Sequence, residues 1–246
     1  MKAVLLIGGS DSSGGAGIAR DLRTLEHFGT PALCALTAVT AQSDHEVQAV
    51  FPLPPEIIRA QISAAFATRE IAAIKIGMLG TRDAVRTVSQ TLASHAKLPI
   101  VLDPVLVASS GGVLLDAQGR EALCAELLAL ATLLTPNIPE AAALLGTELA
   151  TNDAALLAQA RALLAHGPEA VLLKGGHGNG PEASDLLVRM QAPVRRFTAA
   201  RCARTPRGTG CALASAIAAG LAAGADLDSA CERAKQYVSS LFLNDR

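Results

Sequence analysis

The sequence predicts an α/β fold whose mostly parallel central sheet is covered by helices on both faces. Short aliphatic runs alternate along the chain with longer segments of helical periodicity. The runs are apolar at successive positions, which is typical of parallel strands that are buried on both faces. No shift of composition divides the 246 residues, so we expect one domain that spans 1–246.

Each expected strand is an aliphatic run, and glycine, proline or a capping residue delimits each expected helix. In chain order we expect a strand at 3–7, a helix at 17–28, a strand at 74–76, a helix near 83–96, strands at 100–102 and 133–134, helices at 139–145 and near 152–166, a strand at 171–173 and an alanine-rich helix at 212–221. Because ligands of such sheets bind beyond the carboxyl ends of the strands, we expect the functional residues there.

Composition and charge exclude several classes of protein. Half of the residues are hydrophobic and the net charge is −1 without a long basic run, so a large core is expected and nucleic acid is not an expected partner. The apolar run at 3–7 is too short for a secretory signal, and Gly220 and Gly224 interrupt the apolar helix after Cys211, so no membrane partner is expected. The five cysteines are widely spaced and odd in number, which predicts reduced thiols in the cytoplasm.

The segment Gly208-Thr209-Gly210-Cys211 leads directly into the alanine-rich helix. Glycines allow a close backbone turn, and the first amides of a helix have no carbonyl partners, so this segment predicts an anion hole suited to phosphate. Cys211 stands near the helix N-terminus, where the helix dipole is expected to lower the pKa of a thiol. Taken alone, a glycine-rich loop with a buried cysteine is an equally good interpretation.

Unusual residues also follow the other expected strands. The loop 8–17 is rich in glycine and serine but has neither the G-x-G-x-x-G spacing nor the Lys-Ser/Thr of a Walker A motif. Asp103 follows the strand at 100–102, Asn137 and Glu140 follow the strand at 133–134, and Lys174-Gly175-Gly176-His177 follows the strand at 171–173. Singly, Asn137 is best interpreted as a capping or turn residue and Glu140 as a favourable charge in the first turn of a helix. Together, the set provides the charges that phosphoryl transfer from a magnesium nucleotide requires.

With these residues in this order, the sequence resembles the hydroxymethylpyrimidine and phosphomethylpyrimidine kinases of thiamin biosynthesis, in the ribokinase-like superfamily. The resemblance covers almost the whole chain. The segments that carry it are Gly9-Ser10-Asp11-Ser12-Ser13-Gly14-Gly15-Ala16-Gly17-Ile18, Asp21-Leu22-Arg23-Thr24, Thr37-Ala38-Val39-Thr40-Ala41-Gln42, Lys75-Ile76-Gly77-Met78-Leu79, Asp103-Pro104-Val105, Leu134-Thr135-Pro136-Asn137-Ile138-Pro139-Glu140-Ala141, Lys174-Gly175-Gly176-His177 and Gly208-Thr209-Gly210-Cys211.

The resemblance implies a three-layer α/β/α fold and an activity. Such enzymes phosphorylate the hydroxymethyl group of 4-amino-5-hydroxymethyl-2-methylpyrimidine and then the resulting monophosphate, with ATP and Mg²⁺. By position, Gly208, Thr209 and Gly210 form the anion hole, Cys211 is the base and Lys174 contacts the nucleotide phosphates. Asp103, Asn137 and Glu140 hold the phosphates and the magnesium, with Asp103 and Glu140 as metal ligands, directly or through water. A homodimer is also implied.

For the acceptor, the resemblance points to Gly9, Asp21, Gln42, Met78 and Val105. The carboxamide of Gln42 offers a donor and an acceptor side by side, which matches the ring nitrogen and exocyclic amine of an aminopyrimidine. Asp21 is expected to accept from the same amine or to orient the pocket, and Met78 to form an apolar wall. Each of these residues also has a structural alternative. Asp21 is then an exposed acid in the first turn of a helix, Gln42 a polar residue at a strand end, and Met78 part of the core packing.

The chain departs from the family pattern just before the anion hole and just after Gln42. Arg207 stands where relatives usually have His, so it either favours the phosphorylated acceptor or is solvated, and the second phosphorylation is less strongly indicated than the first. After Gln42, Ser43-Asp44 replaces the usual Asn-Thr beside a loop near the acceptor.

Two alternative functions remain. Some pyridoxal kinases resemble the same family and share the cysteine, and pyridoxal also presents a ring hydroxymethyl group. A non-catalytic regulator that binds nucleotide or pyrimidine is the alternative of another class, although a pure binder would not need Lys174, Asp103 and Cys211 together.

Overall fold

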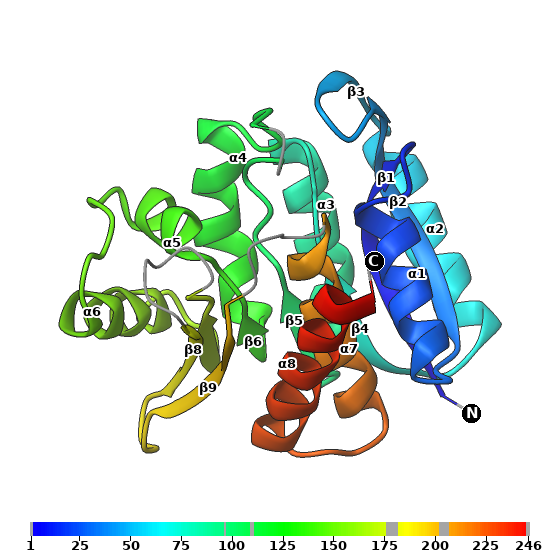
Figure 1. Cartoon of the computed structure of the whole chain (residues 1–246). Coiled ribbons are helices and arrows are strands. Elements are labelled where there is room, and N and C mark those ends of the chain that lie inside the picture. The colour runs from blue at the N-terminus through cyan, green and yellow to red at the C-terminus, as the bar shows by residue number, and fades with distance from the viewer. Residues whose placement is uncertain (1, 96, 109–110, 176–181, 202–206, 245–246) are drawn as a thin grey trace.

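A nine-stranded sheet forms the middle layer of the computed structural model, which describes residues 2–95, 97–108, 111–175, 182–201 and 207–244 (Figure 1). The strands, in the order in which they lie side by side, are β3 (Val47–Pro52), β2 (Ala32–Gln42), β1 (Ala3–Asp11), β4 (Ile71–Ile76), β5 (Ile100–Leu102), β6 (Leu133–Leu134), β7 (Ala170–Leu173), β8 (Glu182–Arg189) and β9 (Arg195–Ala200). The strands from β2 to β7 in this order are parallel, whereas β3, β8 and β9 pair antiparallel at the two edges.

Helices cover both faces of the sheet. One face carries α1 (Gly17–His27), α7 (Thr209–Ala222) and α8 (Leu227–Asn244). The other carries α2 (Pro55–Thr68), α3 (Arg82–Leu92), α4 (Ala117–Ala122), α5 (Ile138–Leu145) and α6 (Asp153–Leu164), with short helical turns η1 (Ala93–His95), η2 (Leu123–Leu127) and η3 (Leu128–Leu130). Among the helices of the described ranges, none is both long and apolar enough to span a bilayer.

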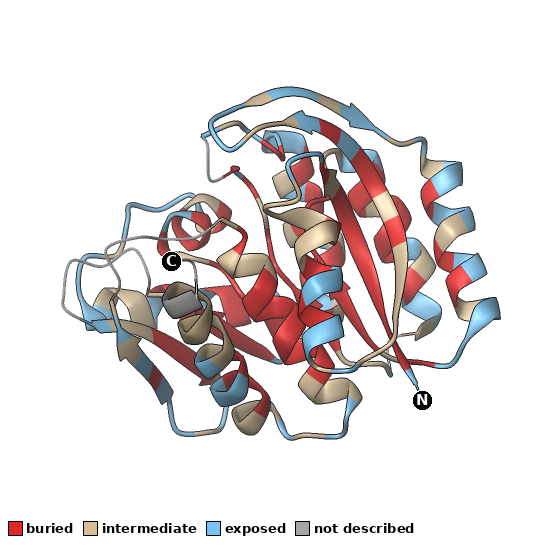
Figure 2. Ribbon diagram, turned by 45° about the vertical axis from the view of Figure 1, so that its right-hand side comes forward, coloured by how far each residue is buried: buried red, intermediate tan, exposed pale blue. Residues whose placement is uncertain are grey.

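The side chains of β1 alternate between two separate cores. Leu5 and Ile7 pack in the core that includes Ile58 of α2, whereas Val4 and Leu6 pack with Leu25 of α1 on the opposite face. All of these side chains are fully buried, and Figure 2 shows the buried residues gathered along the central strands. This alternation with both faces apolar explains why the strands have continuous hydrophobic sequences.

The predicted α/β class, the mostly parallel sheet and its coverage on both faces are confirmed. The expected strands and helices are present, with β1 four residues longer than predicted because Gly8–Asp11 continues to pair with β2. The antiparallel edges and the elements β2, β3, β8, β9, α2, α4 and α8 were not among the expected elements. The edge strands β3 and β9 have exposed faces and α4 has only 6 residues, so their hydrophobic periodicity is weak, whereas β2, β8, α2 and α8 are longer or inner elements that were missed from the sequence.

A charged cluster joins three elements in the interior. Lys75 of β4 lies in the middle of an apolar strand, and its Nζ donates to Oδ2 of Asp21 on α1 at 2.7 Å. The hydroxyl of Ser215 on α7 donates to the other Asp21 oxygen at 2.8 Å. All three residues are buried, with exposed fractions of 1% or less. Burial opposes the charge of Lys75, but the nearby carboxylates, Asp21 above all, outweigh it and keep the pKa of Lys75 above its ordinary value.

The substitution Asp21→Asn is expected to lower the free energy of unfolding by about 3–5 kcal/mol, because it leaves the Lys75 ammonium buried without a carboxylate. Urea denaturation followed by circular dichroism measures the loss. Glu70→Gln is the matched control, since it removes the exposed Lys2–Glu70 pair of equal length, 2.7 Å, and is expected to change stability by less than about 1 kcal/mol. Equal losses in the two variants would contradict the importance of the buried pair.

Candidate active site

The predicted site residues lie at the carboxyl ends of neighbouring parallel strands. Asp103 directly follows β5, Thr135 follows β6 and Lys174 follows β7. The backbone continues this alignment past the strands, since the Lys174 N–H donates to the Pro136 carbonyl at 2.8 Å. Strand order alone therefore brings together polar groups that are 32 or 71 positions apart in the chain.

Lys174 and two carboxylates form a compact charged group. The Nζ of Lys174 donates to Oδ1 of Asp103 at 2.7 Å and lies 3.9 Å from Oε2 of Glu140. The Thr135 hydroxyl donates to the same Asp103 oxygen at 3.2 Å. Burial opposes the charge of Lys174, but Asp103 and Glu140 outweigh it and raise its pKa. Burial raises the pKa of Glu140 to about 7, although Lys174 acts in the opposite direction. The lysine is therefore a fixed cation between two acids.

Asn137 and Glu140 also begin helix α5. The Glu140 N–H donates to Oδ1 of Asn137, the Asn137 N–H donates to Oε2 of Glu140, and both distances are 2.8 Å. This reciprocal capping box starts α5 within one residue of the helix that the sequence predicts at 139–145. The cap occupies Oδ1 of Asn137, so any contact of its side chain with a ligand has to come from the amide NH₂.

The segment Gly208 to Cys211 starts α7 next to this charged group. Gly208 has a left-handed φ of +72°, which favours glycine, and a side chain there would meet the Gly15 carbonyl oxygen. A Cβ atom at Gly210 would lie 3.2 Å from Nζ of Lys174 and 3.6 Å from Oδ2 of Asp103. Glycine at this position thus allows the first turn of α7, with its unpaired amides, to approach the lysine and the acid closely.

The expected low pKa of Cys211 is wrong for the protein in this state. Burial raises the pKa of the thiol to about 11, which outweighs the opposing effects of the Lys75 charge and of a hydrogen bond from the Gly17 N–H. The carboxylates of Asp21 and Asp103 add to the increase. The sequence indicates the helix terminus, but it does not indicate that the half-buried Cys211 loses water around its thiol or that two acids lie nearby.

Four of the residues predicted to hold the acceptor come from β1, β2 and the loops after β4 and β5. A Cβ atom at Gly9 would lie 2.8 Å from Sδ of Met78, so the glycine leaves room for the methionine to cross β1. Met78 and Val105 belong to one small apolar cluster, which also includes Ala38. Gln42 ends β2, and the Thr40 hydroxyl donates to its Oε1 at 3.4 Å. Gly9, Met78 and Val105 therefore lie together, with the carboxamide at the end of the neighbouring strand.

Asp21 has a different environment from the one expected of an exposed helix acid. Both of its oxygens are engaged within the protein, by Lys75 and Ser215, and burial raises its pKa while Lys75 acts against the increase. Lys75 was not singled out from the sequence, although a lysine between Ile74 and Ile76 in a buried strand signals a paired charge. Asp21 is thus placed to orient Lys75 beneath the site.

Two further residues support the loop after β7. The Gly175 N–H donates to Oδ1 of Asp185 at 3.0 Å, and Nζ of Lys235 on α8 donates to the other oxygen of that acid at 2.8 Å. No local motif marked either residue, because the contact joins β8 and α8. Gly176 and His177 of the same loop lie outside the described residues, as do Thr205, Pro206 and Cys202.

Comparisons with known proteins identify the family to which the chain belongs. The family model described as phosphomethylpyrimidine kinase matches residues 11–245. The hydroxymethylpyrimidine/phosphomethylpyrimidine kinase of Rhizobium meliloti is 43% identical over 239 residues, which are 97% of this chain and 90% of the relative. The chain belongs to the phosphomethylpyrimidine kinase family.

Four cysteines in the described part of this kinase are free thiols, namely Cys34, Cys124, Cys211 and Cys231.

Solved structures show the same fold in two kinds of kinase. The phosphomethylpyrimidine kinase of Clostridium difficile 630 has a TM-score of 0.86 and 36% identity, and the comparison covers 98% of this chain and 99% of that one. The pyridoxal kinase of Staphylococcus aureus, solved in complex with pyridoxal, has a TM-score of 0.90 and 31% identity, with 99% and 88% covered. The ribokinase-like architecture of the kinase is confirmed, and the fold is shared by both groups.

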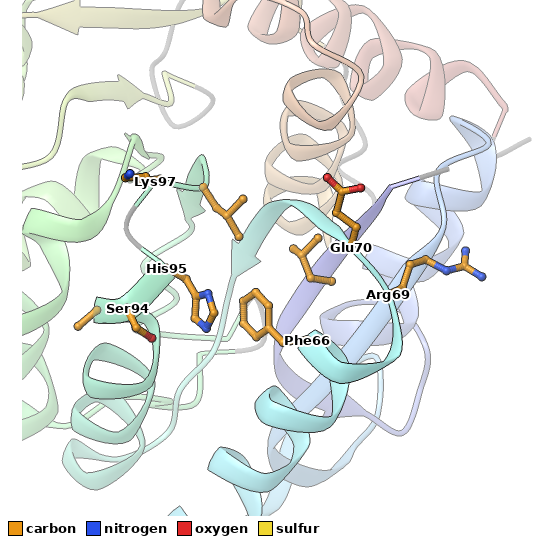
Figure 3. A pocket seen from close by; sticks show the side chains of 9 residues that line it. Phe66, Arg69, Glu70, Ser94, His95 and Lys97 are labelled. Atoms are coloured by element: carbon orange, nitrogen blue, oxygen red, sulfur yellow. The ribbon is translucent and has the colours of Figure 1, made fainter.

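A cavity of about 570 Å³ lies near the amino ends of β4 and β5, at the opposite ends of these strands from the candidate active site (Figure 3). It is lined by Phe66, Arg69, Glu70, Ile71, Ala93, Ser94, His95, Lys97 and Leu98. These residues precede β4 and β5, whereas the candidate active site follows the same strands. The imidazole of His95 stacks on Phe66 at a centroid distance of 3.7 Å, so the cavity wall is held by packing away from the predicted chemistry.

In the kinase without ligands, Cys211 is expected to react with iodoacetamide at a rate that keeps rising beyond pH 9, because only the thiolate reacts and the pKa is about 11. Peptide mass spectrometry over a series of pH values measures the rate at this cysteine alone. Cys231, which is buried and has a pKa raised to about 12, is the internal reference and is expected to react more slowly. A plateau below pH 9 would contradict a neutral Cys211 thiol.

Proposed function

We propose that the kinase transfers the γ-phosphoryl group of ATP to the hydroxymethyl oxygen of 4-amino-5-hydroxymethyl-2-methylpyrimidine, and then a second phosphoryl group to the monophosphate, in thiamin biosynthesis. The relative from Rhizobium meliloti is named for both reactions. A multifunctional thiamine biosynthesis protein of Corynebacterium efficiens is 37% identical over 96% of this chain. A cytoplasmic location and a homodimer remain predictions, and light scattering of the purified kinase tests the dimer.

The close approach of Gly210 to Lys174 is the observation that carries this proposal. It sets a lysine ammonium against the unpaired amides at the start of α7, so two kinds of donor converge on one point. Phosphoryl transfer develops charge on the equatorial oxygens of the transferred group, and fixed donors of this kind stabilise that charge. We assign Gly208, Thr209 and Gly210 to the anion hole and Lys174 to the nucleotide phosphates.

The acceptor is proposed to lie against Gly9, Met78 and Val105. These residues supply an apolar surface at the end of β1 and after β4 and β5, and the Gln42 carboxamide supplies paired polar groups at one edge. An aminopyrimidine has a flat apolar ring with a donor and an acceptor on one edge, which fits this arrangement. Asp21 is proposed to act through Lys75 rather than by touching the ring.

The acids of the site fit a divalent cation. Asp103 and Glu140 provide two carboxylates against the single Lys174 charge, which lies 2.7 Å from Asp103 and 3.9 Å from Glu140. Hard oxygen ligands of this kind suit Mg²⁺, which usually retains several waters. We propose that Asp103 and Glu140 hold it, directly or through water, while the amide NH₂ of Asn137 donates to a phosphate oxygen of the nucleotide. When bound, Mg²⁺ neutralises charge on the phosphates.

Proton removal is assigned to Cys211. In the transfer, the acceptor oxygen bonds to the γ-phosphorus, the bond from that phosphorus to the β–γ bridging oxygen breaks, ADP leaves, and the hydroxyl proton passes to the Cys211 thiolate. With a pKa of about 11, about one molecule in ten thousand holds the thiolate at pH 7, so the thiolate is scarce but strongly basic. Because the transition state is loose, proton transfer is needed late, and Lys75 stabilises the thiolate until then.

The second candidate is a vitamin B6 kinase. The similarity to pyridoxal kinases of Staphylococcus aureus, at a TM-score of 0.90, favours it specifically. Gln42 supports the aminopyrimidine, because a paired donor and acceptor match its edge better than the phenolic edge of pyridoxal.

The test is a kinase assay of the purified protein with MgATP and four acceptors, namely hydroxymethylpyrimidine, its monophosphate, pyridoxal and pyridoxine. Mass spectrometry of the products is expected to find pyrimidine mono- and diphosphate with at least tenfold lower turnover of the B6 compounds. A preference for pyridoxal would transfer the chain to vitamin B6 salvage. Absence of any product would favour a regulator that binds without turnover.

Cys211→Ala is expected to fold and to bind MgATP while losing about 10²- to 10⁴-fold in kcat, which is the usual contribution of a general base. Steady-state kinetics and nucleotide titration calorimetry measure the two effects separately. Cys124→Ala is the control, since Cys124 packs against the core on the other face and is expected to leave kcat unchanged. Turnover of Cys211→Ala at the level of the unmodified kinase would remove the base assignment.

A further inference from the structure

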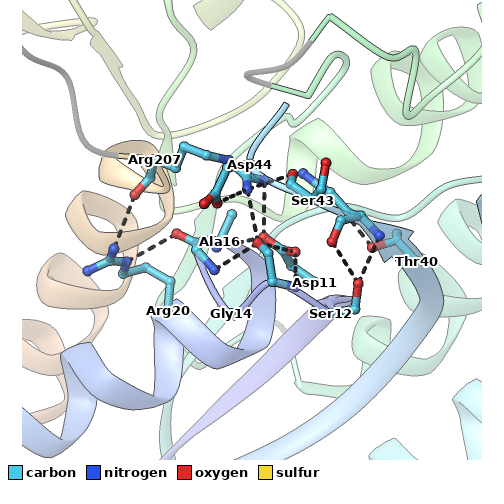
Figure 4. A network of polar contacts seen from close by, with 12 residues as sticks. Asp11, Ser12, Gly14, Ala16, Arg20, Thr40, Ser43, Asp44 and Arg207 are labelled. Atoms are coloured by element: carbon cyan, nitrogen blue, oxygen red, sulfur yellow. Dashed lines mark hydrogen bonds and ion pairs between the residues drawn. The ribbon is translucent and has the colours of Figure 1, made fainter. Parts of the chain in front are cut away.

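Arg207 ties together two loops on the acceptor side of the anion hole (Figure 4). Its Nη1 lies 2.9 Å from the Ser13 hydroxyl, the Ser43 carbonyl oxygen and Oδ1 of Asp44. Its Nη2 donates to Oδ2 of Asp11 at 3.2 Å. Arg207 is therefore not solvated as one interpretation of the sequence suggested, because its side chain has an exposed fraction of only 16%.

The two carboxylates that face Arg207 differ in their surroundings. Asp11 is 6% exposed, and it also accepts from the N–H groups of Ser13 and Ala16 at 2.9 and 2.8 Å, so it is fixed in the loop. The side chain of Asp44 is 73% exposed in the turn between β2 and β3. An exposed ion pair of this kind contributes little to stability, so Asp44 can be exchanged for another anion.

The position of Arg207 places this cation between two parts of the proposed site. It directly precedes Gly208, and Arg20 of α1 donates to its carbonyl oxygen at 3.3 Å, which fixes the backbone before the anion hole. Its bond to Ser43 reaches the residue after Gln42, at the acceptor edge. Nε of Arg207 is buried and has no hydrogen-bond partner among the described residues, so the guanidinium retains donor capacity.

We propose that Arg207 is the binding group for the phosphate of a phosphorylated acceptor, and that this phosphate takes the place of the Asp44 carboxylate on Nη1. The inference rests on the proposed function and deepens it, since it assigns the second acceptor to a particular side chain. Asp44 then serves as an internal substitute for the anion, and Asp11 holds the guanidinium in place during the exchange.

The physical reason lies in the charge of the second acceptor. A phosphate monoester brings a charge of about −1.5 to −2 at pH 7, whereas the hydroxymethyl compound brings none. That phosphate has to approach ATP in a site that already contains the Asp103 and Glu140 carboxylates, so an additional cation is needed for the second step alone. A planar guanidinium offers paired donors that match phosphate oxygens.

Arg207→Met is expected to lower the ratio of kcat/KM for the monophosphate to kcat/KM for the hydroxymethyl compound by about ten- to hundredfold. Most of the change should come from KM for the monophosphate, because the lost contact is with a group that is present before transfer. Arg207→Lys should recover part of the ratio, since the charge returns without the planar pair of donors. Arg196→Met is the matched control, because Arg196 forms an ion pair with Asp153 on the far edge of the sheet.

Asp44→Asn is expected to raise the same ratio by about two- to fivefold, because it removes the competing carboxylate while keeping the shape of the turn. If the Arg207–Asp44 ion pair only stabilised the turn, the two substitutions would change the ratio in the same direction. Opposite effects of Arg207→Met and Asp44→Asn therefore distinguish phosphate binding from a purely structural role. An equal decrease for both acceptors in the two variants, or an unchanged ratio in Arg207→Met, would overturn the proposal.

Titration calorimetry of each acceptor measures the same ratio as binding, without turnover. If the unmodified kinase phosphorylates no pyrimidine, the proposed function fails, and the binding ratio of the two compounds in Arg207→Met still decides whether Arg207 holds the phosphate. If the unmodified kinase phosphorylates the pyrimidine and neither ratio changes in the variant, the assignment of Arg207 alone fails. Thermal unfolding of each variant checks that the loops remain folded.

Discussion

The contact between Lys75 and Asp21 is the constraint on which the rest of the site depends. A lysine buried to 1% exposure in the central strand β4 has to be paired, and its contact with Asp21 holds α1 and, through Ser215, α7 on the same face of the sheet. Ser215 lies one helical turn after Cys211, and Asp21 lies one turn after Gly17, whose N–H bonds the Cys211 thiol. The same two helices therefore set both the buried pair and the first turn of the anion hole.

Charge alternates from this pair outward into the active site. Asp21, Lys75, Asp103, Lys174 and Glu140 carry negative and positive charges in turn, and each of the two lysines keeps its proton because acids lie on more than one side of it. Burial opposes the negative charge of the acids, and it raises the pKa of Glu140 and of Asp21. This row of alternating charges fixes the cations Lys75 and Lys174 in a buried site, where they act more strongly on a phosphate than exposed lysines would.

The sequence predicts the centre of the sheet and the strand-end residues well for a physical reason. Strands buried on both faces need apolar side chains at every position, and functional residues of such sheets lie at strand ends, so both signals are local. The capping box of Asn137 and Glu140 is equally local, because its partners are three residues apart. Lys75, Asp185 and Lys235 escaped prediction because their partners lie on other elements. The pKa of Cys211 was predicted with the wrong sign for the same reason, since its desolvation is a property of the assembled core.

Acceptor choice has to reside in few side chains, because the fold is common to pyrimidine and pyridoxal kinases. The backbone of this kinase resembles a pyridoxal kinase at a TM-score of 0.90 and a phosphomethylpyrimidine kinase at 0.86, so backbone geometry does not separate the two acceptors. An apolar wall such as Met78 discriminates between flat rings weakly, whereas a side chain that needs a hydrogen-bond partner rejects a ring that lacks one by orders of magnitude. Gln42 is the group proposed to act in this way on the ring edge. Arg207 is the group proposed to act on charge, and its bond to Ser43 places it at the same strand end, so the two proposed selections would act side by side on one acceptor.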